Sequence, residues 1–223
     1  MAETAVKPQV EEKEPLFGKK EKFLITDPLN DNNPITVQVL GICSALAVTT
    51  LVVPSFVMAI AVVFVTAFAN LIVSLLRNSI PTQIRMIVQL VVIATLVTVV
   101  ELTLKALSFE VYKQLSVFIG LIITNCIVMG RLEAFALGHG VWKSFLDGIG
   151  NAAGYGVILI IVAFFRELLG SGKLLGYQVI PDAVYAMGYE NNGLMLLSPM
   201  ALITVGILIW IQRSRNRGLI EKN

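Results

Sequence analysis

Long hydrophobic runs alternate with short polar or charged segments along most of this chain. A helix needs roughly 20 apolar residues to cross a hydrocarbon core of about 30 Å. By this measure, and with Pro34, Pro54 and Pro81 as helix-start or turn signals, the pattern predicts six transmembrane spans. They cover residues 35–53, 55–76, 86–104, 115–131, 148–165 and 193–212.

Two of the six spans differ from ordinary lipid-facing helices. Span 4 reaches Gly130-Arg131 after only 15 residues and carries the polar pair Asn125-Cys126 near its centre. Either Arg131 lies at the membrane interface, or the helix is broken and continues to Ala136. Span 1 has no charge but holds several small or polar residues, a content that suits packing against protein. We therefore expect spans 1 and 4 to be broken into half-helices.

The composition supports the membrane interpretation. Hydrophobic residues make up 56% of the 223 residues and charged residues only 14%, with a mean hydropathy of +0.80. Because a soluble domain of this length is less apolar, we expect an all-α integral membrane protein. The net charge of +2 gives no reason to expect a nucleic-acid partner. A single histidine cannot supply a Ser/His/Asp or Cys/His set, so we assign no catalytic residue.

The ends of spans 2 and 5 share one sequence pattern. Val73-Ser-Leu-Leu-Arg77 closes the first and Val162-Ala-Phe-Phe-Arg166 the second, and each preceding span holds one cysteine. A three-span unit used twice inserts its second copy upside down, because an odd number of crossings reverses direction. We therefore expect a solvated tail, two inverted three-helix repeats and a C-terminal tail, at residues 1–33, 34–112, 113–213 and 214–223.

The basic residues predict how the six spans are oriented. Thirteen of the 17 Lys and Arg lie on the side that holds both termini, the 2–3 loop and the 4–5 loop. Cytoplasmic loops carry an excess of these residues. Both termini are therefore expected in the cytoplasm.

Cys43 and Cys126 are the only cysteines, and both lie near the midplane of their spans. A lone membrane cysteine is more often a small buried hydrophobe, and a disulfide is a further alternative. A metal centre would use the pair as thiolates, which favour iron–sulfur clusters, zinc or copper. Because a cluster normally needs four thiolates, the other two would come from a second polypeptide or a second copy of this one. Ser44 and Asn125 are then available to tune the sulfur ligands.

Three carboxylates lie in or near the spans and are candidates for an ion path. Asp147 precedes a glycine-rich helix start, where capping is about as good an interpretation as ion handling. Glu133 could pair with Arg131 or lie on an ion path. Glu101, beside Lys105, fits an interfacial position. The pair Arg166-Glu167 is most simply interpreted as marking a membrane interface.

Four segments carry a resemblance to a known family. They are Gly41-Ile-Cys-Ser-Ala-Leu-Ala-Val-Thr49, Gly120-Leu-Ile-Ile-Thr-Asn-Cys-Ile-Val-Met-Gly-Arg131, Ser144-Phe-Leu-Asp-Gly-Ile-Gly150 and Phe165-Arg-Glu-Leu-Leu-Gly-Ser-Gly-Lys173. With them the chain resembles the D-type members of the Nqr/Rnf membrane-subunit family, found in bacterial sodium-translocating NADH:quinone reductases. The likeness covers about Asn30 to Arg213. The related Rnf complex has a similar E subunit, but Ser44-Ala45 looks more like the sodium-pumping reductase.

The resemblance implies a six-helix subunit of the bacterial inner membrane that pairs with a homologous E subunit in opposite orientation. Each partner would supply two cysteines, here Cys43 and Cys126, to a shared intramembrane [2Fe–2S] cluster. Electrons would come from NADH through FAD and a cytoplasmic [2Fe–2S] domain in the F subunit. They would continue to FMN in the C subunit, then through the B subunit to quinone, and Na⁺ export would be coupled to this path.

Other functions stay open at this point. One is the E subunit of an Rnf-type ferredoxin:NAD oxidoreductase. Another is a stand-alone secondary transporter with the same inverted repeat, in which the cysteines are packing residues. A third is a purely structural membrane scaffold, which would tolerate replacement of both cysteines.

Overall fold

The computed structural model describes most of the chain between residues 24 and 215. The described residues are 24–26, 28, 32–81, 83–107, 109–174, 177–178 and 193–215. Most of the two predicted tails therefore lies outside the described residues.

The described residues are helical apart from one pair of two-residue strands and the connecting turns. The elements are α2 (Ile42–Val48), α3 (Val52–Leu76), α4 (Arg85–Leu107), α5 (Phe109–Ile123), α6 (Cys126–Arg131), the π-helix η1 (Leu132–Ala136), α7 (Val141–Ser171), β1 (Lys173–Leu174), β2 (Tyr177–Gln178), the 3₁₀-helix η2 (Gly193–Leu196) and α9 (Ser198–Arg215). The strands β1 and β2 pair antiparallel just after α7. Residues 24–26 and 28 are also helical.

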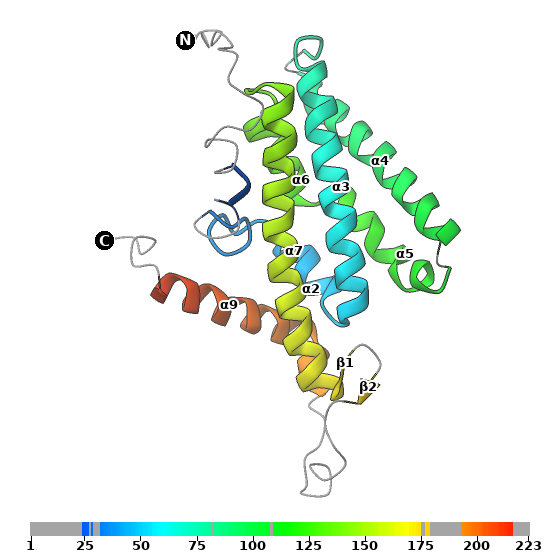
Figure 1. Ribbon diagram of the computed structural model, residues 1–223, viewed down its shortest axis with the longest axis vertical. Helices are drawn as coiled ribbons and strands as arrows, with labels where there is room; N and C mark the ends of the chain where they lie inside the picture. The colour runs from blue at the N-terminus through cyan, green and yellow to red at the C-terminus, as the bar shows by residue number, and fades with distance from the viewer. Residues whose placement is uncertain are drawn as a thin grey trace, which may run out of the picture.

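The centre of the fold is the pair α3 and α7, which run side by side and share the largest helix contact (Figure 1). Small residues on α7 make this approach possible. A Cβ at Gly148 would lie 3.1 Å from the Cα of Ala67, and one at Gly156 would lie 3.0 Å from the Cβ of Ala59. Because the two backbones are this close, a larger side chain at either glycine would push α7 away from α3. Most other elements of the described chain are packed around this pair.

The predicted break in span 4 is confirmed. The helix α5 ends at Ile123, the backbone is extended at Asn125 with φ −70° and ψ 120°, and α6 begins at Cys126. The chain then continues through η1 to Ala136, as expected if Arg131 does not end the span. Both α6, labelled in Figure 1, and η1 contact α3 and α7.

Span 1 is more strongly interrupted than predicted. Residues 34–38 form turns rather than a helix, and Val39 has a positive φ of 58°. The helical part is α2, which has only seven residues and begins after Gly41. The helix start expected at Pro34 is therefore wrong, although the Asn33 side chain does accept hydrogen bonds from the N–H groups of Ile35 and Thr36, at 3.0 and 3.3 Å.

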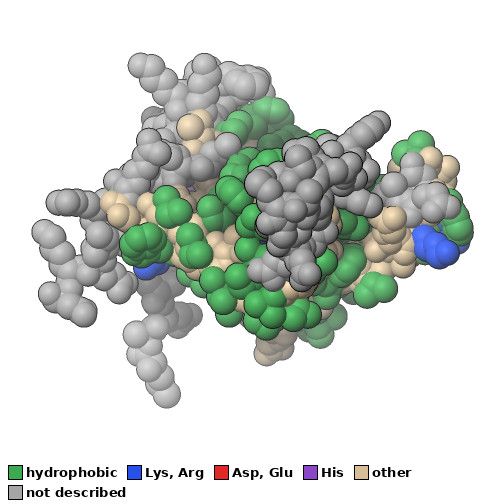
Figure 2. All heavy atoms as spheres, turned by 90° about the horizontal axis from the view of Figure 1, so that it is seen from below, with side chains coloured by type: hydrophobic (Ala, Val, Ile, Leu, Met, Phe, Trp, Pro, Cys, Tyr) green, Lys and Arg blue, Asp and Glu red, His purple; other side chains and the backbone are tan. Residues whose placement is uncertain are grey.

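Four segments of the described chain are long and apolar enough to cross a membrane: residues 52–76, 85–107, 112–136 and 141–171. They correspond to predicted spans 2 to 5. Neither the segment of span 1 nor α9, where span 6 was predicted, is among them, and α9 lies crosswise to α7 (Figure 1). Hydrophobic side chains cover much of the face drawn in Figure 2. Exposed large apolar residues of α4 such as Ile87, Val91 and Leu102 suit contact with lipid.

Candidate functional site

The two cysteines come together although they are far apart in the sequence. The Sγ atoms of Cys43 and Cys126 lie 3.9 Å apart, and both residues are exposed free thiols. Cys43 is the second residue of α2, and Cys126 is the first residue of α6. The breaks in spans 1 and 4 therefore place both thiols at the same point on the surface.

The local sequence explains why both short helices begin there. Asn125 caps α6, because its side-chain oxygen accepts a hydrogen bond from the N–H of Ile127 at 3.2 Å. At the start of α2 the backbone of Gly41 is left-handed, with φ 77° and ψ 16°, a conformation that glycine adopts without steric cost. Each cysteine thus follows closely on a residue suited to starting a helix.

Behind the thiols, three buried side chains connect the two cysteine segments to α7. Ser44 Oγ lies 2.8 Å from Tyr155 Oη, and the amide of Asn125 donates to Ser44 Oγ at 3.3 Å. All three residues are at most 1% exposed. The structure thus brings the predicted residues Ser44 and Asn125 together directly behind the cysteines. Tyr155 was not predicted; the only signal for it was one hydroxyl in an otherwise apolar run.

The thiol separation fits two ligands of one tetrahedral metal ion. Metal–sulfur bonds of about 2.3 Å at tetrahedral angles hold two sulfurs about 3.8 Å apart. The described residues contain no group of three or more His, Cys, Asp or Glu that could complete such a site. Because the chain has only two cysteines, a four-thiolate centre requires two more from another polypeptide. The exposure of the pair leaves it accessible to such a partner.

Gly41→Ala should destabilise the site. The left-handed backbone costs a non-glycine residue roughly 1–2 kcal/mol, and the new Cβ would lie 2.6 Å from Cδ1 of Ile127 and 3.2 Å from the Tyr155 ring. We expect a clear fall in the melting temperature of the purified protein, measured by thermal unfolding in detergent. Gly120→Ala in α5 is the control, because nothing lies within 4 Å of its added Cβ. Equal melting temperatures for the two variants would contradict this prediction.

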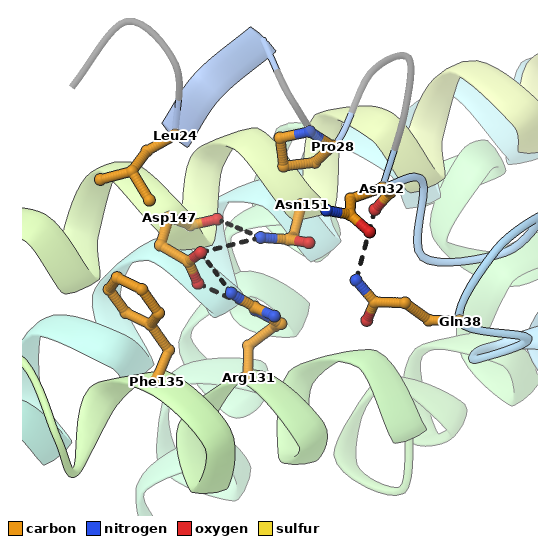
Figure 3. Close-up of a pocket in the computed structure, with 8 residues that line it drawn as sticks. All are labelled: Leu24, Pro28, Asn32, Gln38, Arg131, Phe135, Asp147 and Asn151. Atoms are coloured by element: carbon orange, nitrogen blue, oxygen red, sulfur yellow. Dashed lines mark hydrogen bonds and ion pairs between the residues drawn. The ribbon is translucent and has the colours of Figure 1, made fainter. Parts of the chain in front are cut away.

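Asp147 is a buried ion-pair partner, so the predicted capping role is wrong. The helix α7 begins at Val141, which puts Asp147 inside the helix, where it is only 2% exposed. Both carboxylate oxygens accept from Arg131: Nε lies 2.9 Å from Oδ2, and Nη2 bonds Oδ1. The Asn151 amide also donates to Oδ1 at 3.1 Å. These residues line a cavity of about 190 Å³ together with Leu24, Pro28, Asn32, Gln38 and Phe135 (Figure 3).

The other two carboxylates have different partners. Glu133 forms an ion pair with Arg85, and the Gln89 amide donates to it at 3.1 Å. Of the two interpretations of Glu133, pairing with Arg131 is wrong, because Arg131 binds Asp147. Glu101 accepts a hydrogen bond from the hydroxyl of Tyr112 at 3.0 Å. None of the three carboxylates joins the cysteine pair.

Arg166 and Glu167 are buried inside the protein, at 1% and 3% exposure, which does not fit a simple interface marker. The Arg166 guanidinium donates to the backbone oxygen of Leu46 and the hydroxyl of Thr49, at 3.3 and 2.5 Å. It also donates to the backbone oxygens of Met195 and Leu196, at 3.1 and 2.8 Å. Glu167 accepts from the N–H of Val52, the first residue of α3, at 2.5 Å. Arg166 thus holds the end of the short helix that carries Cys43.

Arg77 makes a similar contact in the other half of the chain. Its guanidinium donates to the backbone oxygen of His139 at 2.8 Å, as does the hydroxyl of Ser74 at 2.9 Å. His139 follows η1, the continuation of the helix that begins at Cys126. Each arginine of the repeated sequence pattern therefore binds a segment that follows the cysteine of the other half.

The helical fold, with its long apolar segments, agrees with the comparison to known proteins. The family model described as "Rnf-Nqr subunit, membrane protein" matches residues 22–209, so the chain belongs to this family of membrane proteins. A relative from Photobacterium profundum is 58% identical over 195 residues, covering 87% of this chain and 93% of its own length. Relatives from Serratia proteamaculans and Pasteurella multocida are 55% and 54% identical, covering 92% of this chain and 98% of their own lengths. All three are named as the D subunit of the Na(+)-translocating NADH-quinone reductase.

Proposed function

We propose that this protein is the D subunit of a sodium-translocating NADH:quinone reductase and serves in electron transfer across the membrane. It would supply Cys43 and Cys126 to an intramembrane [2Fe–2S] cluster shared with a homologous E subunit. The observation that carries the proposal is the exposed thiol pair, 3.9 Å apart. The names and high identities of the relatives favour this over the E subunit of an Rnf-type complex.

The chain's own residues would hold and orient the two ligands. The breaks at Gly41 and Asn125 turn the two helix starts toward one surface, and Arg166 and Arg77 hold the segments that follow. A bound cluster would accept and release one electron at a time, at a potential set by its hydrogen bonds and its exposure. Ser44 and Asn125, each beside a cysteine in sequence, are joined by a hydrogen bond of 3.3 Å and would support the two ligand-bearing segments from behind.

The proposed partners extend beyond the E subunit. Electrons would arrive from NADH through FAD and the cytoplasmic [2Fe–2S] domain of the F subunit. They would leave to FMN of the C subunit, then through the B subunit to quinone. The protein would lie in the bacterial inner membrane with both termini in the cytoplasm. Residues 34–112 and 113–213 would form the two inverted three-span repeats, and the packing of α3 on α7 and the two arginine contacts support this division.

We propose Asp147, Glu133 and Glu101 as candidates for the sodium path, and each already has a hydrogen-bond or ion-pair partner that a cation would meet. At Asp147 a cation would have to displace the Arg131 guanidinium, and at Glu133 it would have to displace Arg85. At Glu101 it would meet the carboxylate that accepts the Tyr112 hydroxyl, with no arginine to displace among the described ion pairs.

Metal analysis of the purified complex tests the proposal. We expect about two iron and two acid-labile sulfide ions more than the peripheral NADH-oxidising subunit holds by itself. A stand-alone transporter, purified as this chain, would contain neither. A complex whose iron is fully accounted for by the peripheral subunit would contradict the proposal.

A further inference from the structure

We propose that Tyr155 is a positioning residue for the cysteine pair, because its hydroxyl holds the two cysteine-bearing segments in register. This inference rests on the proposed function. Tyr155 belongs to α7, whereas Cys43 and Cys126 lie on α2 and α6. It is fully buried behind the exposed thiols and does not need to contact the cluster itself.

The direction of the hydrogen bonds follows from counting hydrogens. Ser44 Oγ carries one hydrogen and two acceptor lone pairs. It donates that hydrogen to the backbone oxygen of Gly41 at 3.0 Å. Tyr155 Oη, 2.8 Å away, must therefore donate to Ser44, and the Asn125 amide donates to the second lone pair at 3.3 Å. Ser44 is fully satisfied only when α7 and the start of α6 are both in place.

Two features fix the position of Tyr155 relative to the two cysteine-bearing segments. Its sequence neighbours are tightly packed: a Cβ at Gly154 would lie 2.5 Å from the backbone oxygen of Pro28, and one at Gly156 would lie 3.0 Å from Ala59 of α3. The ring also limits the space at Gly41, where an added Cβ would lie 3.2 Å from its Cε2 atom. The position of the α2 start is therefore set by a side chain that cannot readily shift along its own helix.

The consequence concerns the geometry of the thiol pair. Ser44 follows Cys43 and Asn125 precedes Cys126, so the bond between Ser44 and Asn125 joins the two residues adjacent to the ligands. Without the Tyr155 hydroxyl, Ser44 loses one of its two hydrogen-bond donors. The contact between the two cysteine-bearing segments is then held less firmly. Loss of one buried hydrogen bond should lower the population of the state in which the two cysteine-bearing segments are aligned by roughly three- to tenfold.

The test compares Tyr155→Phe with Thr98→Val in the whole complex. Both replacements remove one hydroxyl donor, but the Thr98 hydroxyl bonds the backbone oxygen of Ala94 in its own helix and takes no part in the Ser44 network. The first measurement is bridging of Cys43 to Cys126 by dibromobimane in membranes stripped of iron, quantified by mass spectrometry of the bridged peptide. The second is the midpoint potential and electron paramagnetic resonance spectrum of the intact intramembrane cluster.

We expect Tyr155→Phe to slow bridging roughly three- to tenfold and to shift the potential and spectrum, whereas Thr98→Val matches the unmodified protein. Ser44→Ala breaks the same contact from its other end, so the double variant should behave like Ser44→Ala alone. If Tyr155→Phe does not accumulate, Ser44→Ala gives the result, and unchanged bridging in it overturns the inference. Unchanged readouts in Tyr155→Phe, or additive effects in the double variant, also overturn it. If the unmodified complex lacks the cluster, the proposed function fails, whereas the bridging rates still decide the role of Tyr155.

Discussion

Serine in place of either Cys43 or Cys126 should abolish the intramembrane cluster and with it quinone reduction from NADH. A hydroxyl is a poor substitute for a thiolate toward iron, and the described residues offer no third ligand near the pair. Electron flow would stop between the cytoplasmic carrier and the FMN-bearing partner. NADH oxidation by the peripheral subunit, measured with a soluble artificial acceptor, should continue at the normal rate.

The measurement pairs the two rates with the iron content of the purified complex. Thr124→Ala is the matched control, because Thr124 is an exposed residue in the same helix break but carries no thiol. This control should keep both rates and its iron. Full quinone reductase activity in both cysteine variants would exclude the shared cluster and leave packing as the role of the thiols.

Arg166→Met should cause a large loss of stability, because it removes a buried guanidinium that donates to several oxygen atoms. Methionine leaves the backbone oxygens of Leu46, Met195 and Leu196 without this donor, and the hydroxyl of Thr49 loses a partner as well. These hydrogen bonds are buried or part-buried, and a hydrogen bond to a charged group contributes roughly 1.5–3 kcal/mol, so the total reaches several kcal/mol. That is a large share of the stability of a typical domain, about 5–15 kcal/mol.

Thermal unfolding in detergent, followed by fluorescence, measures this effect. Arg77→Met is the control, since the bond from Arg77 to the backbone oxygen of His139 is solvent-accessible. Its melting temperature should fall far less. A smaller fall for Arg166→Met than for Arg77→Met would show that the buried hydrogen bonds of Arg166 contribute little.

The sequence indicated the thiol pair because both cysteines lie near the midplane of corresponding spans in a predicted inverted repeat. A polar pair in a short apolar span indicated the break at Asn125, and the matching position of Cys43 indicated its partner. Ser44 and Asn125 could be named because they are adjacent to the cysteines. The helix break and the two neighbouring residues were local signals, whereas the pairing of cysteines 83 residues apart rested on the repeat.

The predictions that were wrong depend mostly on partners far away in the sequence. Capping was one of two interpretations of Asp147 because a glycine-rich run follows it, but α7 begins already at Val141, and Arg131 of α6 pairs with Asp147. The role of Tyr155 was missed, because nothing in the sequence indicates that its hydroxyl lies beside Ser44, 111 residues away. The start of span 1 was misplaced because Asn33 does cap a turn, while the positive φ of Val39 stops that turn from becoming a helix.

The arginine contacts also bear on the order in which the newly made chain can mature. The backbone oxygen of Leu46 meets its donor only after Arg166 has been synthesised, and Arg77 finds its acceptor only after His139. The two hydrogen-bond partners of Ser44, Asn125 and Tyr155, are likewise synthesised long after it. Under the proposed function, loading of iron would therefore be a late event in biogenesis. An incomplete polypeptide released by the ribosome before α7 would expose both thiols without the geometry that makes them a matched pair.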